Sequence, residues 1–343
     1  MHSVPSAYPR ASLSARLRRA ALHRLVRYQL RRSMSRLGVS QPLGRKSLTA
    51  TNHRADVTLL RENGQVEIAL PADPTHVVFM QRESITAYLY LLFNCSPSVT
   101  AMSCACSDGH ESSDARFTPS SRTKNAILVP DRYFILRHGF SAERALADAA
   151  DLTWAGRSDT IVWRGAANGE GIHPQIAEDA ANPRVIQRAR LCMLAKDAPR
   201  VDAKLVAGQG ASRTLTAFAP LGILGAQRPE PHWLNDKFAI DIDGWTNAWS
   251  NLIVRMHFGC CVLKVASADG YRQWWYDRLR PWEHFVPVQA DMTDLLEKIE
   301  WARSNDSEAQ VIAARGQQLV RSMTLTTETA LAVQTIEQNW NTN

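Results

Sequence analysis

The sequence lacks the patterns that define several large classes of protein. No stretch approaches the roughly 20 consecutive apolar residues of a membrane-spanning helix, and the N-terminus has no apolar core of the signal-peptide type. The phosphate-binding pattern GxxxxGK(S/T), the zinc-protease pattern HExxH and the hydrolase pattern GxSxG are also absent. We therefore expect a cytoplasmic protein that is neither secreted nor membrane-spanning and that carries a different kind of site.

The chain has few cysteines, and their spacing suits neither a disulfide framework nor a common zinc site. Of the six, Cys104 and Cys106 are separated by one residue, and Cys260 and Cys261 are adjacent. Neither spacing matches the separation typical of paired zinc ligands. Free thiols in a reducing compartment are the favoured interpretation.

Acidic residues are missing from the first 55 positions, which carry twelve Lys or Arg side chains. Because the whole chain has a net charge of +7, the residues after position 55 have a net charge of −5. This part of the chain is mildly acidic, and an acidic surface binds nucleic acid poorly. A helix is expected over residues 13–34, although its leucines do not gather on one face. An anionic membrane surface is one partner for this arm, since each Lys or Arg contributes roughly 1 kcal/mol there. A solvated basic tail and a misassigned start codon are the alternatives.

The pattern of apolar stretches predicts an α/β protein with a basic N-terminal extension. We divide the chain into residues 1–55 (basic arm and linker), 56–160 (first α/β domain), 161–325 (second α/β domain) and 326–343 (C-terminal helix or tail). A helix is expected at 141–150, with Ser141 as its cap. In the second domain, strands are expected at 161–163, 204–207, 238–242 and 261–265, and helices at 182–195, 248–258, 291–304 and 307–323. This alternation is typical of a parallel, doubly wound sheet.

Two short patterns are weak by themselves. Gly208-Gln-Gly210 follows an expected strand, but no third glycine completes a dinucleotide fingerprint, so an ordinary turn is favoured. Asp241 and Asp243 have the Asp-x-Asp spacing of metal-dependent sugar transferases, and two carboxylates suit a hard cation. Alternation along a strand produces the same spacing without any metal.

Two other patterns suggest an anion site. In Trp163-Arg164-Gly165, a guanidinium follows a strand, where the loops of an α/β sheet meet ligands, and its planar fork suits a diphosphate. In the segment Asp243-Gly-Trp-Thr-Asn-Ala-Trp-Ser250, small polar residues lie between a strand and a helix start. Backbone amides and the hydroxyls of Thr246 and Ser250 could receive phosphate oxygens there. A capped helix start without ligand is the alternative.

Eight elements in order resemble glycosyltransferase family 90, the group of Rumi-type protein O-glucosyltransferases and capsule-associated (CAP10-like) xylosyltransferases, and most closely its bacterial lipopolysaccharide-modifying branch. The resemblance covers roughly residues 105–325. The elements are Pro130-Asp131-Arg-Tyr-Phe134, Trp163-Arg-Gly165, Lys237-Phe with Asp243-Gly244, the strand 259–264, Pro281-Trp-Glu-His-Phe-Val-Pro287, the segment 291–295, Lys298-Ile-Glu-Trp301 and Ile312-Ala-Ala-Arg-Gly316.

The resemblance implies a GT-B fold, with two Rossmann-like domains facing across a cleft. Residues 56–160 would form the acceptor side and 161–325 would bind a UDP-sugar, with no metal or other cofactor required. Asp241 and Asp243 then become part of the strand end. His284 would contact the donor sugar or only bond to the backbone. The expected donor-binding residues are Arg164, Gly165, Lys237, Gly244, Trp245, Thr246, Asn247, Ala248, Trp249, Ser250, Arg184 and His284.

The sequence departs from the family pattern at two places. The animal enzymes carry Ser-x-Arg where this chain has Ala248-Trp-Ser250. The missing arginine is expected to weaken diphosphate binding unless Arg184, Arg188 or Arg255 replaces it. The family's aspartate base aligns with Ala126, so its role cannot be carried over.

We consider Asp131 and Asp108 as catalytic bases in its place, with Asp131 favoured because it lies five residues from the aligned position. The alternative is that Asp131 orders a turn and Asp108 ends a loop.

The expected function is an inverting, metal-independent transfer of glucose or xylose from a UDP-sugar. The acceptor would be a glycan, lipopolysaccharide or protein hydroxyl, with no nucleic-acid partner. A location at the inner face of the membrane follows if the basic arm is a tether. Three alternatives remain: a metal-dependent transferase that uses Asp241 and Asp243, an NAD-type oxidoreductase that uses the Gly208 loop, and a non-catalytic glycan- or lipid-binding homologue.

Overall fold

The computed structural model describes residues 13–39, 43–51, 56–71, 74–109, 114–207 and 217–341. The chain divides into two compact units. Unit 1 comprises Met1–Ser107, Ser113–Phe117 and Val333–Asn343, and unit 2 comprises Asp108–Ser112 and Thr118–Ala332. The boundary predicted at residue 160 therefore lies inside unit 2.

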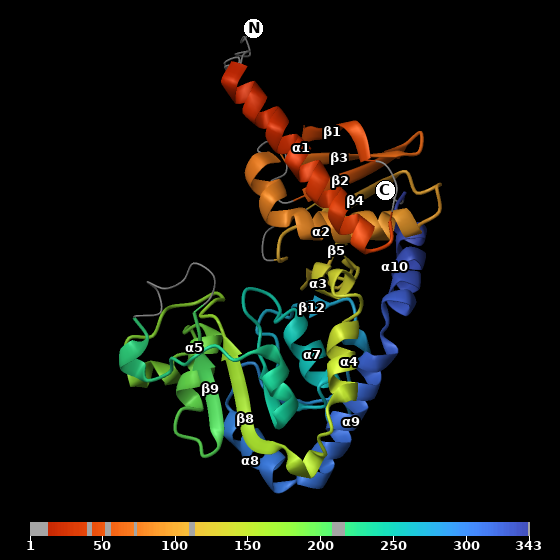
Figure 1. Ribbon diagram of the computed structural model, residues 1–343. Helices are drawn as coiled ribbons and strands as arrows, with labels where there is room; N and C mark the ends of the chain where they lie inside the picture. The colour runs from red at the N-terminus through yellow and green to blue at the C-terminus, as the bar shows by residue number, and fades with distance from the viewer. Residues whose placement is uncertain are drawn as a thin grey trace. The chain divides into compact units, whose positions relative to one another are not determined.

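Unit 1 combines a mixed sheet with two long helices (Figure 1). The strands β2 and β3 form an antiparallel pair, β2 also pairs antiparallel with β4, and β1 pairs parallel with β3. Helix α1 contacts α2 and buries Leu30 and Met34. The elements are α1(Leu13–Arg36), β1(Leu43–Thr51), β2(Asp56–Glu62), β3(Gln65–Pro71), α2(Pro74–Asn94) and β4(Ala101–Ala105).

The helix expected at 13–34 is confirmed by α1, whereas the linker expected at 37–55 is wrong in part. Residues Leu43–Thr51 form strand β1 along β3. Strand formation depends on the backbone of a neighbour as much as on composition, and the neighbour here comes later in the chain. Among the described residues, none of the helices combines the length and the apolar character needed to cross a bilayer.

Unit 2 is built on a five-stranded parallel sheet in the order β13-β11-β10-β8-β9. Its strands are β8(Ser158–Gly165), β9(Val201–Leu205), β10(Asp236–Asp241), β11(Cys261–Val265) and β13(Val286–Val288). The four expected strands and the α/β class with a Rossmann-like sheet are confirmed. They are recognisable because strands buried on both faces are nearly continuous apolar runs.

Helices cover this sheet and supply most of the hydrophobic core. Residues of α5, α8 and α9 pack with the sheet in one buried cluster, and α7 contacts β10 and β11. The four helices expected in this part of the chain are confirmed, each within a few residues at its ends. Their bounds are α5(Gln187–Leu194), α7(Ser250–His257), α8(Leu295–Ser304) and α9(Asp306–Ser322), and α10(Leu325–Asn339) follows.

The helix expected at 141–150 is confirmed as α4(Ser141–Ala149), but its predicted cap is wrong. The N-cap residue is Phe140, which has left-handed backbone angles and makes no side-chain cap bond. Its ring is buried, lies edge-on to Phe134 and packs under the Arg137 guanidinium. Packing of the Phe140 ring therefore fixes the start of α4, and Ser141 is the first helical residue.

The strand order places a topological switch point between β8 and β10. From β8 the chain adds β9 on one side and then returns to add β10 on the other. Loops that leave neighbouring parallel strands in opposite directions open a crevice at their carboxyl ends, which is where ligands of such sheets bind. By this rule, the residues after Gly165 and after Asp241 mark the place where a ligand is expected.

Candidate functional site

A buried ion pair forms the floor of the site at the carboxyl end of β10. Asp241, which is fully buried, accepts a hydrogen bond of 2.8 Å from the Asn251 side chain and pairs with Lys264 Nζ at 2.9 Å. The Asp241 charge raises the pKa of Lys264 well above its usual value despite burial of the ammonium group. Asp241 precedes the segment 243–250 and Asn251 follows it, so the hydrogen bond between them ties the two ends of the segment together. Lys264 anchors the same carboxylate to β11.

Two buried polar side chains of that segment each have an atom without a hydrogen-bond partner among the described residues. Thr246 and Asn247 are 1% and 2% exposed. Within the described residues, neither Thr246 Oγ1 nor Asn247 Nδ2 has a hydrogen-bond partner. Asn247 Oδ1 does have one, because the Ser120 hydroxyl donates to it over 2.5 Å. Buried polar groups are almost always satisfied, so two such groups side by side indicate a place for a ligand.

Asp243 adds a buried carboxylate to the same segment. It is 5% exposed, and among the described residues neither of its carboxylate oxygens has a hydrogen-bond partner. Burial raises its pKa to about 6, although the charges of Lys264 and Arg188 oppose that shift. Asp243 is therefore partly protonated near neutral pH, whereas Asp241 is committed to Lys264.

Arg188, near the start of α5, supports the segment from below. Its Nε donates to the Asp243 carbonyl over 3.0 Å and its Nη2 to the Ile242 carbonyl over 3.3 Å, and Nη1 donates to Asn168. Burial lowers its pKa to about 10, so it remains positively charged at neutral pH. A Cβ on Gly244 would lie 2.7 Å from Asn168 Oδ1 and 3.1 Å from Arg188 Cζ, so only glycine fits over this guanidinium.

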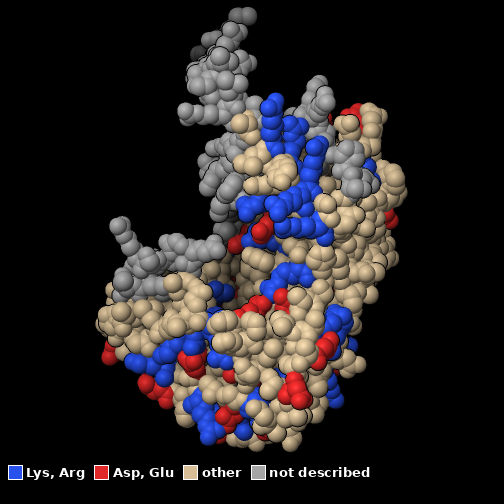
Figure 2. Space-filling model, viewed as in Figure 1, with Lys and Arg blue, Asp and Glu red and all other residues tan. Residues whose placement is uncertain are grey.

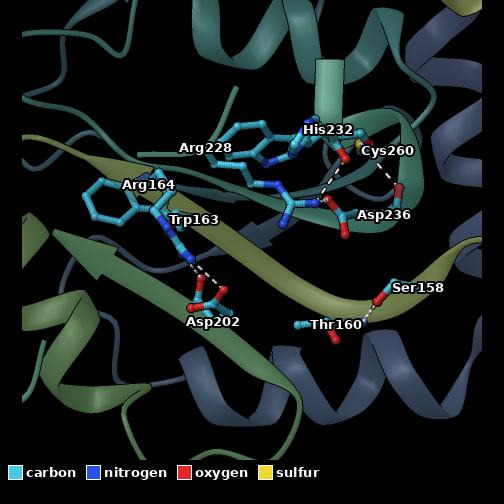
Figure 3. Close-up of polar contacts among 10 residues, drawn as sticks. Ser158, Thr160, Trp163, Arg164, Asp202, Arg228, His232, Asp236 and Cys260 are labelled. Atoms are coloured by element: carbon cyan, nitrogen blue, oxygen red, sulfur yellow. Dashed lines mark hydrogen bonds and ion pairs between the residues drawn. The ribbon is translucent and has the colours of Figure 1, made fainter. Parts of the chain in front are cut away.

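Arg164 is engaged by protein groups at the end of β8. Its guanidinium pairs with Asp202 at 2.5 Å and also donates to the carbonyls of Asp202 and Ala226. Figure 3 shows the side chain directed from β8 toward Asp202 on β9, and only 13% of it is exposed. Arg164 therefore has protein partners at the β8–β9 edge, and its donor-binding role stays a prediction. The alternation of apolar and polar residues along β8 did not predict that Asp202 on β9 would pair with Arg164.

Two other predicted donor-binding residues lie elsewhere or are already engaged. Lys237 stands near the amino end of β10, opposite the site, where it pairs with Asp306 at 2.8 Å and lies over the Trp154 ring. His284 Nδ1 accepts from the Arg280 amide over 3.1 Å, which is the backbone bond considered as its alternative. Burial lowers the pKa of His284.

The remaining predicted residues lie at the end of β8, in the segment 243–250 and before α5. Gly165 ends β8, and a Cβ there would lie 2.4 Å from the Trp163 ring. Trp245 is 43% exposed, Ala248 and Trp249 precede α7, and Ser250 is its first residue. Trp249 has a left-handed backbone and lies 6.1 Å from the Tyr133 ring. Arg184 is exposed.

The two predicted bases have different surroundings. Asp131 is the N-cap of α3(Arg132–Leu136), and its Oδ1 accepts from the amides of Tyr133 and Phe134. Its Oδ2 accepts from Gln273 over 3.2 Å, and burial raises its pKa. Asp108 is half-buried. Asp131 thus caps a helix, where the alternative considered for it was the ordering of a turn, and its catalytic role stays a prediction.

Three contributors to the site escaped sequence reasoning: Ser120, Asn168 and Gln273. Ser120 and Gln273 face each other in a short antiparallel ribbon of β6(Ser120–Ser121) and β12(Arg272–Gln273). A two-residue strand carries no periodicity, so nothing in the sequence marks this pairing. Among the described residues, no group of three or more His, Cys, Asp and Glu side chains is arranged to hold a metal ion. The Gly208 loop lies outside the described residues.

Comparison with known proteins shows which family the chain belongs to. The family described as Glycosyl transferase family 90 matches residues 142–329, more than half of the chain. Protein O-glucosyltransferase 2 of Danio rerio is 40% identical over 86 residues, which cover 25% of this chain and 17% of that protein. Uncharacterized protein 035R of Invertebrate iridescent virus 3 is 34% identical over 104 residues, which cover 30% of this chain and 9% of the viral protein.

The chain therefore spans less than a fifth of the length of these curated relatives. A solved structure, that of Anabaena Alr3699/HepE in complex with UDP-glucose, is similar at a TM-score of 0.35 and 13% identity. The similarity covers 58% of this chain and 52% of that one.

The raised pKa of Asp243 predicts a specific pH dependence of stability. The folded chain holds this proton more tightly than the unfolded chain, whose pKa is near 3.8, so ionisation of Asp243 reduces stability as the pH rises from about 4 to about 6. We expect Asp243→Asn to raise the free energy of unfolding by about 1–3 kcal/mol at pH 7 and to have little effect at pH 4. Urea denaturation of both proteins from pH 4 to 8 measures this difference. A constant difference over that range would contradict it.

Proposed function

The chain belongs to glycosyl transferase family 90 and is a glycosyltransferase, and from this premise we propose that it takes a glucose- or xylose-class sugar from a UDP-sugar. The acceptor is a hydroxyl of a glycan, lipopolysaccharide or protein. The transfer inverts the anomeric carbon and uses no metal or other cofactor. As in a GT-B enzyme, the parallel sheet of unit 2 holds the nucleotide sugar.

The observation that carries this proposal is the unsatisfied polar surface at the carboxyl end of β10. Thr246 Oγ1 and Asn247 Nδ2 are buried hydrogen-bonding groups in a segment that leads into the N-terminus of α7. Helix N-termini attract phosphate through their oriented amides. A diphosphate would supply the oxygen acceptors that this segment lacks, and the switch point of the sheet is where such a ligand binds.

Arg188 takes the place that the sequence assigned to Arg164. Its contacts with the carbonyls of Ile242 and Asp243 fix the path of the segment, and its charge lies under Gly244. Fixed positive charge and helix amides stabilise a leaving diphosphate without a metal, because they need no reorganisation when the bond breaks. We propose that Arg188 contributes through the segment and the local field.

The reaction needs a base for the acceptor hydroxyl. The hydroxyl oxygen bonds to the anomeric carbon, the bond from that carbon to the UDP oxygen breaks, and the hydroxyl proton passes to a carboxylate. Asp131 remains the favoured group: burial raises its pKa, which makes it a stronger base, and Gln273 holds it. Asp108 is the second candidate.

Two alternatives differ in their requirements. A metal-dependent transferase would need Asp241 to leave Lys264, which costs several kcal/mol for a buried pair. A non-catalytic glycan- or lipid-binding homologue is favoured by one observation, since Ala126 stands at the aligned base position and Asp131 already caps a helix. Sugar transfer separates this second alternative from the enzyme.

The exposed face of α1 supports a peripheral membrane location. Arg24, Arg32 and Arg36 are exposed on it, together with Leu25 at 45% and Tyr28 at 62% exposure. Leu30 and Met34 are buried on the opposite face. Figure 2 shows Lys and Arg side chains gathered along this helix. We propose that this face contacts anionic lipid at the inner side of a membrane, with the aromatic and aliphatic groups entering the headgroup layer.

Replacing each arginine separately tests the donor site. We expect UDP-glucose or UDP-xylose to raise the melting temperature of the unaltered chain, because a ligand that binds the folded state stabilises it. Arg188→Ala should weaken UDP binding about 10- to 100-fold, and Arg188→Lys should restore part of it. Arg164→Ala should lower stability and leave the UDP affinity of the folded protein within about twofold. These figures follow from the value of charge-assisted hydrogen bonds. The reverse pattern, measured by calorimetry, would return the donor role to Arg164.

Asp131→Asn tests the base. Asparagine caps helices as well as aspartate, so the fold should be retained. We expect sugar transfer to fall by about 10²- to 10⁴-fold with UDP binding unchanged, and Asp108→Asn should have a smaller effect. Transfer is measured as UDP release with a panel of glycan acceptors. Full transfer by Asp131→Asn would remove the assignment.

Vesicle binding tests the face of α1. Changing Arg24, Arg32 and Arg36 to Gln should reduce partitioning onto phosphatidylserine-containing vesicles by about 100-fold, since each cation contributes about 1 kcal/mol. Changing Arg200 and Arg280, which are exposed in unit 2, to Gln should have little effect on this partitioning. Equal partitioning of the two variants in a sedimentation assay would contradict the proposal.

A further inference from the structure

A short ribbon brings residues from two distant parts of unit 2 against the segment 243–250. Ser120 on β6 pairs with Gln273 on β12, and Arg272 secures the ribbon by donating to the Lys124 carbonyl over 2.6 Å. The side chain of Ser120 then reaches Asn247. Residues more than a hundred positions apart thus meet beside the buried polar atoms of Thr246 and Asn247 that have no hydrogen-bond partner among the described residues.

The position of Ser120 is strictly defined. Its carbonyl accepts from the Thr118 hydroxyl over 2.8 Å. Gly109, which has a φ of +96°, packs so closely that a Cβ there would lie 2.8 Å from the same carbonyl oxygen. Ser120 is 1% exposed, so water does not compete for its hydroxyl. The Ser120 hydroxyl is therefore held where it meets one atom of Asn247.

In this contact the Ser120 hydroxyl donates to one end of the Asn247 amide, and the other end is left for a ligand. A side-chain amide has an oxygen that accepts and a nitrogen that donates twice. With Oδ1 engaged by Ser120, Nδ2 is the free end, and in the described part of the chain it meets no acceptor. A buried donor without a partner costs about 1–3 kcal/mol, and a ligand oxygen would remove that cost.

We infer that Asn247 contacts a diphosphate oxygen of the donor through Nδ2, and that Ser120 is the positioning residue that holds the other end of this amide through Oδ1. The inference rests on the proposed function and deepens it. Phosphate oxygens only accept hydrogen bonds, so a fixed N–H donor distinguishes them from groups that donate. Thr246, also unsatisfied, lies next to Asn247 and extends the same surface. Ser120 thus links the segment 118–131, which carries Asp131, to donor recognition.

Calorimetry with UDP and with uridine tests the inference on the full chain. Ser120→Ala should weaken UDP binding about 5- to 10-fold and leave uridine binding unchanged, because only the diphosphate meets Nδ2. Asn247→Asp should weaken UDP binding by about 100-fold or more, since a carboxylate oxygen would then face phosphate. Ser121→Ala is the matched control: it removes the same atom one residue away, where the hydroxyl accepts from the Thr123 amide and does not contact Asn247 among the described residues.

A double substitution separates positioning from general loss of structure. In an Asn247→Ala background, Ser120→Ala should have no further effect on UDP affinity. An additive loss, an equal loss of uridine affinity, or equal behaviour of Ser120→Ala and Ser121→Ala would overturn the inference and leave the proposed function intact. If the unaltered chain bound neither UDP nor any UDP-sugar, both the proposed function and this inference would fail.

Discussion

The buried pair of Asp241 and Lys264 is the constraint on which the candidate site depends. It joins the end of β10 to β11, and Asn251 brings the start of α7 to the same carboxylate. The chain between Asp241 and Asn251 is therefore a loop with both ends fixed. Arg188 holds its first carbonyls and Ser120 holds its middle. With so many contacts fixing it, the segment can keep polar groups unsatisfied without collapsing over them.

Those unsatisfied groups are a cost that the rest of unit 2 must offset. Thr246 and Asn247 bury donors without partners, and Asp243 buries a carboxylate whose pKa rises to about 6. Each reduces the stability of the free chain. The continuous core under α5, α8 and α9 can supply that stability, because apolar burial adds in proportion to area. A site that is strained when empty and satisfied when filled gains affinity from its own preorganisation.

The sequence was sufficient to predict most of the fold of unit 2 but only part of the site. Buried parallel strands such as Cys261–Val265 are apolar runs, and they were recognisable for that reason. The role of Arg164 was not predictable, because its partner Asp202 belongs to a strand 38 positions later. Ser120 and Gln273 lie in a ribbon too short to have a pattern. Phe140 starts α4 through packing of its ring, where the sequence favoured Ser141.

Charge balance at the site explains how a diphosphate and a carboxylate could share it. Lys264 neutralises Asp241, which leaves Arg188 as the positive charge nearest to Gly244 and Asp243 as a carboxylate close to half protonated near pH 6. A diphosphate placed at Thr246 and Asn247 would raise the pKa of Asp243 further, since like charges in a poorly solvated site favour protonation of one of them. Donor binding would then take up a proton, and the neutral Asp243 could donate a hydrogen bond to the ligand. The carboxylate that destabilises the empty site above pH 6 would become a favourable contact in the filled one.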